Sequence, residues 1–426
     1  MQELPRVRRG HHEPNVRGVC RQREGLLLVL LHGSWWPSQQ FCTRGELLGA
    51  TETPWFVLAL RSSLFAASPL PPLSLSLSLL LTLTPNVRPS PSPPTHVQRH
   101  TTTHNTGGGA NTYDIPNGVT FGGSESGGGT ALKAGGGGYV FMLQTHTWGS
   151  WIYEIADVDA TGKNITFGAG GFQEARGGSG GCGTGAFYIS HRQEMLDSPG
   201  EWYLDEKAGK LYTAVLPGGT PPATVVASNI EQLFSVSGAS QAAAVKNVRI
   251  SSLTLRHAAP TYMANYSVGS GGDYAVHRGG AISLLNTMNV TIDHNLFDGV
   301  GGNGVWLHAF NRYAMVTANE MRNMGENGIG MTGETVWVDG TAGDQPRFNT
   351  IEGNLIHHVG LYNKQACAVF HAVSCQNSVK ENVFFHGPRA LFNMNDAFGG
   401  DTRIVSNLFF KSMLETHEYV SALRQV

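Results

Sequence analysis

Carboxyl groups near the end of the chain are the best candidates for chemistry. Asp396 closes the segment Asn393-Met-Asn-Asp396 and is followed closely by Gly399 and Gly400. A carboxyl group can act as a general acid, a general base or a nucleophile, and such work usually engages a second group. Asp401 and Glu418 are the candidate partners. For Asp396 and Asp401 the competing interpretation is a turn residue that bonds to its own backbone.

Imidazole, aromatic and amide side chains upstream could bind a polar ligand. The two His side chains titrate near neutrality and can bind hydroxyl groups or transfer protons, or they can lie on a solvated sheet face. An indole ring can stack on a ligand or pack at an interface. An Arg can pair with an anionic ligand or with a neighbouring acid. The candidate binding residues are His308, Trp306, His371, Asn393, Asn395 and Arg389.

A repeated unit must position these residues. The segment Asn289-Val-Thr-Ile-Asp-His-Asn-Leu-Phe-Asp298 returns in related forms, and its shared Asn recurs at intervals of 24, 35, 28 and 25 residues. Apolar residues flank this Asn with the period of two that is typical of strands. A fixed unit with variable insertions indicates a solenoid, and we expect the Asn residues to occupy left-handed bends and to bond to one another along the stack. The recurring residues are Asn295, Asn319, Asn354, Asn382 and Asn407.

A second strand follows each bend and carries the candidate binding residues. The segments that begin at Gly304, Gly328, Ala368 and Ala390 can be laid over one another. Because alternate residues of a strand face opposite ways, this alignment predicts two columns. The inner column comprises Leu307, Met331, Phe370 and Phe392, and the outer column comprises His308, Thr332, His371 and Asn393.

These features resemble right-handed parallel β-helix proteins of the pectin-lyase-like superfamily. The likeness covers about residues 140–415 and is closest to the branch of β-helix glycoside hydrolases with fucosidase-like and xylanase-like members. It rests on the repeats and on the segments Gly170-Gly-Phe-Gln-Glu-Ala-Arg-Gly177, Ser198-Pro-Gly-Glu-Trp-Tyr-Leu-Asp205 and Lys210-Leu-Tyr-Thr213. The fold alone does not define the activity, because the same architecture serves hydrolases, lyases, epimerases and adhesins.

The resemblance implies one catalytic carboxylate at Asp396 and a second after a Glu-Thr-Gly-Asp segment. This chain has Glu415-Thr-His-Glu418 instead and ends at Val426, so we expect a β-helix truncated at its C-terminus. The first hypothesis is a glycoside hydrolase that acts on a polysaccharide through carboxylate acid/base chemistry. The alternatives are a non-catalytic glycan-binding or cell-surface β-helix protein and a polysaccharide lyase or epimerase.

Composition limits the cofactors and partners. The formal net charge of −2 does not favour nucleic-acid binding, which typically requires a basic surface. We expect no metal and no cofactor, with Ca²⁺ considered only for the lyase hypothesis, because no acidic cluster surrounds a basic residue. The expected partner is a polysaccharide or other glycan. We expect a monomer without a transmembrane span.

The first 105 residues differ from the rest of the chain. They contain ten Arg but no Lys, and Ser74 to Leu79 alternates Ser and Leu. Since a CT dinucleotide repeat also encodes alternating Leu and Ser, we hypothesise that this low-complexity segment is disordered or is not authentic coding sequence. The expected organisation is therefore a segment without a core (1–105), a Gly-rich and irregular β-rich part (106–245) and the β-helix rungs (246–426).

An extracellular or cell-surface location is expected from the resemblance and from three glycosylation acceptor triplets. These triplets begin at Asn164, Asn265 and Asn289. The apolar run Leu26–Leu31 is short for the core of a signal peptide. The sequence therefore favours export without containing a clear signal peptide.

Overall fold

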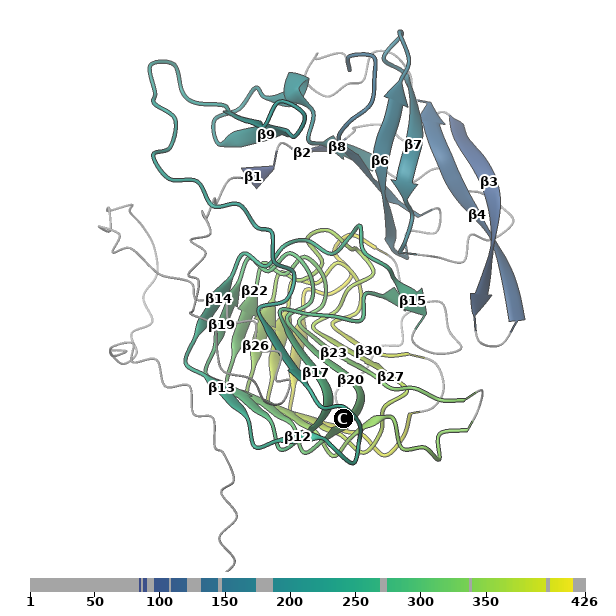
Figure 1. The fold of residues 1–426 in the computed structure, drawn as a ribbon, viewed down its shortest axis with the longest axis vertical. Helices are drawn as coiled ribbons and strands as arrows, with labels where there is room; N and C mark the ends of the chain where they lie inside the picture. Colours follow the sequence, from purple (N-terminus) through teal and green to yellow (C-terminus); the bar gives the residue numbers. More distant parts are fainter. Residues whose placement is uncertain are drawn as a thin grey trace, which may run out of the picture.

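The computed structural model describes residues 84–85, 87–89, 96–106, 109–120, 132–144, 148–173, 187–268, 274–336, 339–395 and 399–416. Apart from one turn of 3-10 helix at Gln193–Met195, the regular elements of these residues are β-strands. An antiparallel N-terminal sheet lies above a stack of three parallel sheets (Figure 1). The prediction of an all-β parallel β-helix is confirmed for the described residues.

The N-terminal sheet has seven strands that run antiparallel to their neighbours. Trp151, Tyr153 and Phe167 belong to the core that packs against one of its faces. A smaller sheet beside it joins β1 (Thr84–Pro85), β9 (Glu201–Asp205) and β10 (Lys210–Thr213). In spatial order, the strands of the large sheet are β2 (Val87–Pro89), β8 (Phe187–Ser190), β5 (Tyr139–Leu143), β6 (Ser150–Val158), β7 (Asn164–Gly170), β4 (Gly109–Thr120) and β3 (His96–Thr106).

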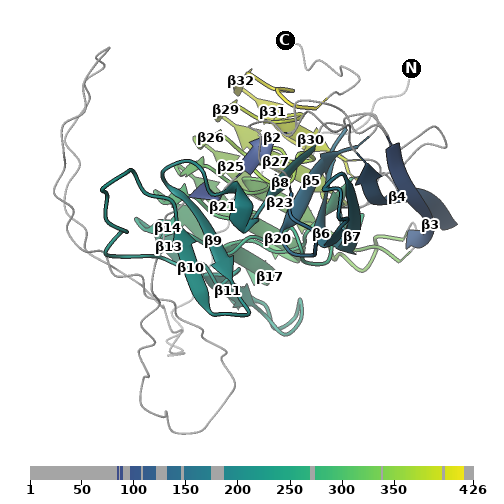
Figure 2. The same ribbon diagram turned by 90° about the horizontal axis from the view of Figure 1, so that it is seen from above.

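Three parallel sheets form the β-helix, and each rung contributes one strand to each sheet (Figure 2). The first sheet, called sheet I here, has β11 (Phe234–Ser237), β17 (Ile282–Met288), β20 (Val305–Arg312), β23 (Ile329–Thr332), β27 (Val369–Ala372) and β30 (Phe392–Met394), with β12 (Val245–Lys246) and β24 (Pro346–Arg347) beside it. Sheet II has β13 (Arg249–Ser251), β18 (Thr291–Asp293), β21 (Met315–Thr317), β25 (Thr350–Glu352), β28 (Ser378–Lys380) and β31 (Arg403–Val405). Sheet III has β14 (Thr254–Arg256), β19 (Leu296–Asp298), β22 (Glu320–Arg322), β26 (Leu355–His357), β29 (Val383–Phe385) and β32 (Leu408–Phe410).

Three-residue strands explain how the core is filled. In sheets II and III the middle residue of each strand points inward and its two neighbours point outward, as the alternation of a strand requires. Val316 and Met321 are examples of such middle residues, and both are at most 1% exposed. Their equivalents in the other rungs pair in register along the stack. The interior is therefore a set of apolar columns parallel to the helix axis.

Left-handed residues make the corners between sheets II and III. The residue with positive φ is the one before each recurring Asn, for example His294 (φ 55°), Ala318 (φ 52°) and Glu381 (φ 58°). The expectation that the Asn itself occupies the left-handed bend is therefore wrong. The bend is made one residue earlier, which leaves the Asn side chain free to point into the corner.

The recurring Asn residues bond to one another along the axis, as predicted. The side-chain oxygen of Asn354 accepts hydrogen bonds from the backbone N–H of Asn319 (3.0 Å) and from its side-chain amide (3.0 Å). The Asn354 amide donates in turn to Val316 O (2.8 Å) and to Asn382 Oδ1 (3.0 Å). The same pattern links the ladder of Asn295, Asn319, Asn354, Asn382 and Asn407. Their buried amides are thus all hydrogen-bonded.

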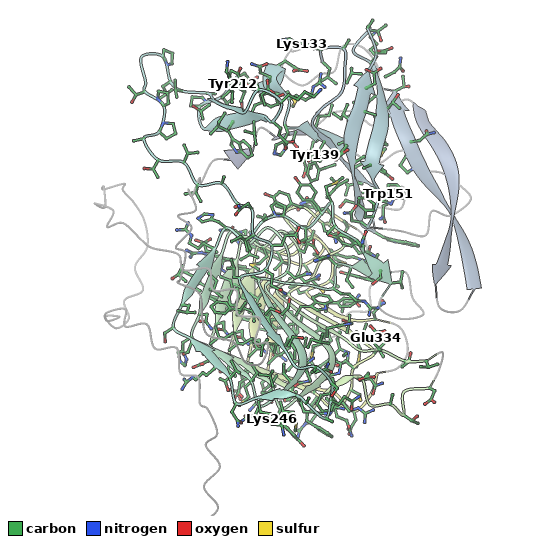
Figure 3. The ribbon with its side chains drawn as sticks, in the orientation of Figure 1. Lys133, Tyr139, Trp151, Tyr212, Lys246 and Glu334 are labelled. Carbon is green, nitrogen blue, oxygen red and sulfur yellow. The ribbon has the colours of Figure 1, made fainter. Side chains whose placement is uncertain are left out.

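The N-terminal sheet docks on the β-helix through aromatic side chains. Phe141 stacks on Tyr188 with ring centroids 4.6 Å apart and meets Tyr262 of the β-helix edge to face at 5.4 Å. The backbone N–H of Lys364 donates to Ser150 Oγ (3.0 Å). Tyr139, labelled in Figure 3, meets Tyr262 edge to face with ring centroids 5.7 Å apart. The contact fixes the N-terminal sheet against one edge of the rungs.

Candidate functional site

The outer face of sheet I contains an aromatic cluster that a hairpin covers. Trp306 of β20 and Phe370 of β27 stack with centroids 6.2 Å apart, and Tyr274 lies 4.9 Å from Phe370. Tyr274 directly precedes the hairpin strand β16 (Ala275–Val276), which pairs with β15 (Ser267–Val268). Gly330 lies between the two stacked rings in the register of the sheet. A Cβ atom at Gly330 would meet Trp306 Cζ3 at 2.0 Å, so only Gly leaves room for the indole.

A chain of hydrogen bonds leads from this buried cluster to an exposed carboxylate. Trp306 Nε1 donates to Thr332 Oγ1 (3.1 Å). Thr332 Oγ1 also lies 3.3 Å from His308 Nδ1, and a hydroxyl that accepts one bond can either donate to this nitrogen or accept from it. The other imidazole nitrogen, Nε2, faces Glu334 Oε1 at 3.5 Å. Polar contacts thus connect the buried indole to Glu334.

Glu334 also forms an ion pair with Arg278, whose guanidinium contacts the same carboxylate oxygen. The Glu334 side chain is 48% exposed, and Figure 3 shows it on the side of the β-helix formed by sheet I. Burial lowers the pKa of His308, and the positive charge of Arg278 lowers it further, against opposing effects of Glu334 and Asp344. At neutral pH the site therefore combines a neutral imidazole, a guanidinium and an accessible carboxylate.

His308 lies on the outer face of sheet I, as predicted. Leu307 and Met331 point inward and pair with each other, and His308 pairs with Thr332. The predicted outer column continues differently after these two rungs, because Thr332 pairs with Ala372 rather than with His371. The column of polar side chains is therefore interrupted.

The predictions for Phe370 and His371 are wrong by one residue of register. His371 pairs with Met331 and points into the core, where it is 0% exposed, whereas Phe370 belongs to the outer column of Trp306. The His371 Nε2 atom lies 3.3 Å from Asn377 Nδ2 and 3.4 Å from Thr402 Oγ1. Burial lowers the pKa of His371 to about 4. A ligand outside the β-helix does not reach this side chain.

Trp306 is also fully buried, so the prediction that its ring receives a ligand is wrong for this conformation. The interpretation as a packed interface aromatic agrees with its contacts to Phe370 and Tyr274 in one cluster. Arg389 is 5% exposed, and its guanidinium carbon lies 5.0 Å from the centre of the Tyr274 ring. It therefore packs against the aromatic cluster from the C-terminal side.

Of the remaining predicted residues, the structure describes Asn393 and Asn395. Asn393 pairs with Phe370 on the outer face of sheet I, and the backbone N–H of Asn395 donates to His371 O (2.8 Å). Asp396 follows the end of β30 by two residues and lies outside the described part of the chain, as does Glu418. Their roles stay predictions.

Asp401 is exposed and occupies a corner position. Its φ of 53° matches the left-handed residues that precede sheet II in the preceding rungs, such as Phe348 (φ 58°) and Gln376 (φ 58°). This geometry agrees with the competing interpretation of Asp401 as a turn residue. A catalytic role for Asp401 stays a prediction, but the position explains why a residue that tolerates the left-handed region stands there.

Sequence reasoning missed Glu334, Arg278 and the role of Thr332. The segment Met331-Thr-Gly-Glu334 contains a usable signal: Glu334 follows the last residue of β23 by two positions, just as Asp396 follows the last residue of β30. Arg278 had no such signal, because it belongs to the insertion with the covering hairpin.

Within the described ranges, no group of three or more His, Cys, Asp or Glu side chains could hold a metal ion. The same residues contain no helix that is long and apolar enough to cross a membrane.

Comparisons with known proteins agree with this architecture. Residues 234–409 match a family model described as "Right handed beta helix region". These rungs form a right-handed parallel β-helix. A search of curated proteins found no match. A solved structure titled "Glycoside hydrolase" is similar with a TM-score of 0.50 and 18% sequence identity, over 75% of this chain and 61% of that chain. At this identity the likeness concerns the fold, and this chain spans about three fifths of the length of that protein.

Proposed function

We propose that this β-helix protein is carbohydrate-active and hydrolyses glycosidic bonds of a polysaccharide. The observation that carries the proposal is the exposed carboxylate of Glu334, which Arg278 and His308 hold at the outer face of sheet I. A purely structural role does not require this arrangement. Polar contacts connect the buried indole of Trp306, through Thr332 and His308, to the exposed Glu334 carboxylate. The similarity in fold to a protein titled "Glycoside hydrolase" supports the same class.

Hydrolysis of a glycosidic bond uses one carboxyl group as the acid and a second as base or nucleophile. We assign the ionised role to Glu334, because the contact with Arg278 stabilises a negative charge there. Asp396 is the proposed acid, which agrees with its place two residues after a strand of the same sheet. With its hydrogen on Nε2, His308 would orient Glu334 by donating toward Oε1.

The proposed substrate is a glycan outside the cell. Of the three acceptor triplets, those at Asn265 and Asn289 have an exposed Asn, whereas Asn164 is half-buried and its side-chain amide donates to Asp159 Oδ2 (2.5 Å). An extracellular or cell-surface location, a monomeric state and the absence of nucleic-acid partners belong to this proposal. The formal net charge of −2 supports the last of these.

A panel of polysaccharides incubated with the full chain tests the reaction class. New reducing ends and the absorbance of unsaturated uronates should be followed together. We expect reducing ends without unsaturation, and we expect them to disappear in Asp396→Asn. Unsaturated products would instead make the protein a lyase. Binding without either signal would favour a non-catalytic glycan-binding protein, and both results would contradict the proposed hydrolysis.

A further inference from the structure

Three imidazole rings form a hydrogen-bonded chain at the corner of the β-helix that follows sheet III. His357 ends β26, His358 follows it in the left-handed region (φ 52°), and His386 takes the same corner position one rung later (φ 55°). His357 Nδ1 lies 2.6 Å from His358 Nδ1, and His358 Nε2 lies 2.8 Å from His386 Nδ1. Both nitrogens of His358 are therefore engaged by neighbouring rings.

Charged groups surround the chain at both ends. Glu320 Oε1 of β22 lies 3.8 Å from His357 Nε2, and Arg322 of the same strand also acts on this ring. Lys411, which follows β32, contributes a positive charge near His358. Phe385 of β29 stacks on His357 with centroids 4.6 Å apart. All three imidazoles are partly buried.

The number of protons that the chain can hold follows from its bonds. Each contact between two ring nitrogens needs one N–H and one lone pair. Three neutral imidazoles satisfy both contacts, and one additional proton is tolerated if His358 donates to both neighbours. A second additional proton places two N–H groups against each other in one contact. Full protonation of the three rings therefore breaks the chain.

We propose that the chain of His357, His358 and His386 is an acid-sensitive latch that ties consecutive rungs together at neutral pH and opens in acid. The two linked corners lead directly into the segments 359–368 and 387–391, which return to sheet I. His386 precedes Arg389 by three residues, and Arg389 packs on Tyr274 beside the aromatic cluster. If the proposed function holds, the latch regulates the same face that carries Glu334 and leads to Asp396.

The surroundings of His357 and His358 lower their pKa values, as an acid-sensitive latch requires. Burial lowers the pKa of His357, with the adjacent His358 as the next cause. Burial also lowers the pKa of His358, followed by the effects of His386 and Lys411. Since these folded-state pKa values lie below the unfolded value of about 6.5, the unfolded chain binds more protons in mild acid. The stability that depends on the latch is present above about pH 6.5 and is lost as the pH falls below it.

Calorimetry of the full chain measures this directly. The unfolding enthalpy near pH 5.5, compared between buffers of different ionisation enthalpy, gives the number of protons taken up on unfolding. Three free imidazoles take up about three protons at this pH, and the folded latch holds at most one. The variant with His357→Gln, His358→Gln and His386→Gln should therefore take up about two protons fewer than the wild type. The matched control His294→Gln removes a ring that is 66% exposed and should change the uptake by less than about one proton. Equal uptake in the wild type and the triple variant would overturn the proposal.

Local opening is tested in the wild type alone, in case the triple variant does not fold. Amide hydrogen exchange in peptides over 383–395 should accelerate about tenfold between pH 7.5 and 5.5, after correction for intrinsic rates, which corresponds to a one-unit change in log K. Peptides over 291–298 should change much less, because no imidazole chain links their corners. Parallel behaviour of the two regions would contradict the latch. Neither measurement needs substrate, so its outcome is independent of the proposed hydrolysis.

Discussion

The corner that carries the Asn ladder and the outer face of sheet I belong to the same rungs but follow different rules. At the corner five successive rungs repeat one residue type, and each Asn hydrogen-bonds to the next. On the outer face of sheet I the column reads Trp306, Gly330, Phe370 and Asn393, with no residue repeated. Residues that repeat from rung to rung thus build the fold. The face to which we assign chemistry is the one on which the residue type changes from rung to rung.

Disruption of the Asn ladder should give the largest loss of stability. Asn354→Leu removes the acceptor of two Asn319 donors and the donor to Val316 O, all of them buried. Each unsatisfied buried group costs about 1–3 kcal/mol, so we expect a loss of roughly 3–6 kcal/mol in the free energy of unfolding. Urea unfolding at neutral pH measures it. The exposed control Asn265→Ala should lose less than about 0.5 kcal/mol. Equal losses in the two variants would show that an Asn of the ladder contributes no more to stability than an exposed Asn.

The unfolding free energy should depend on pH through His371, which lies in the interior behind sheet I. Its folded-state pKa of about 4 lies below the ordinary value of about 6.5. The stability that depends on the neutral ring is therefore present above about pH 6.5 and is lost as the pH falls toward 4, by up to about 3 kcal/mol. His371→Met, which continues the column of Met331 and Met394, should flatten the dependence of unfolding free energy on pH in this window. An unchanged profile would place the titration elsewhere.

At the outer face of sheet I the stability should depend on side-chain volume, whereas at the corner of the Asn ladder it should depend on hydrogen-bonding groups. Gly330→Ala places a methyl group against the Trp306 ring, and overpacking of this kind costs about 1–3 kcal/mol. Gly400→Ala is the matched control, because its Cβ would meet no atom within 4 Å. Thermal unfolding followed by Trp fluorescence would report both stability and the environment of the indole. A shift in the control as large as that in Gly330→Ala would contradict the packing described here.

The comparison also explains what could be predicted from the sequence. The Asn spacing and the alternation around it were sufficient for the fold, because a buried amide that bonds to its own copies must recur. The register at Phe370 and His371 was not predictable in the same way. The alternation of a strand places apolar residues in the interior, but the hairpin of β15 and β16 also covers the outer face, so both faces of β27 are buried.

The site was only partly accessible to sequence reasoning. His308 stands where the pattern placed it, whereas its partners come from insertions of different length. Arg278 lies in the segment after the hairpin, and Glu334 lies in the loop after β23. No periodicity relates these positions, since only the fold brings them together.

Glu334 is proposed to serve chemistry and not the architecture. The rate of reducing-end release by Glu334→Gln, measured on the polysaccharide that the wild type cleaves, tests this together with the unfolding free energy of the variant. We expect the rate to fall by at least about 10²-fold while the stability changes by less than about 1 kcal/mol, as is usual for an exposed ion pair. Asp339→Asn, an exposed carboxylate on the same loop, should retain the wild-type rate. A Glu334→Gln variant that cleaves at the wild-type rate would show that Glu334 takes no part in the reaction.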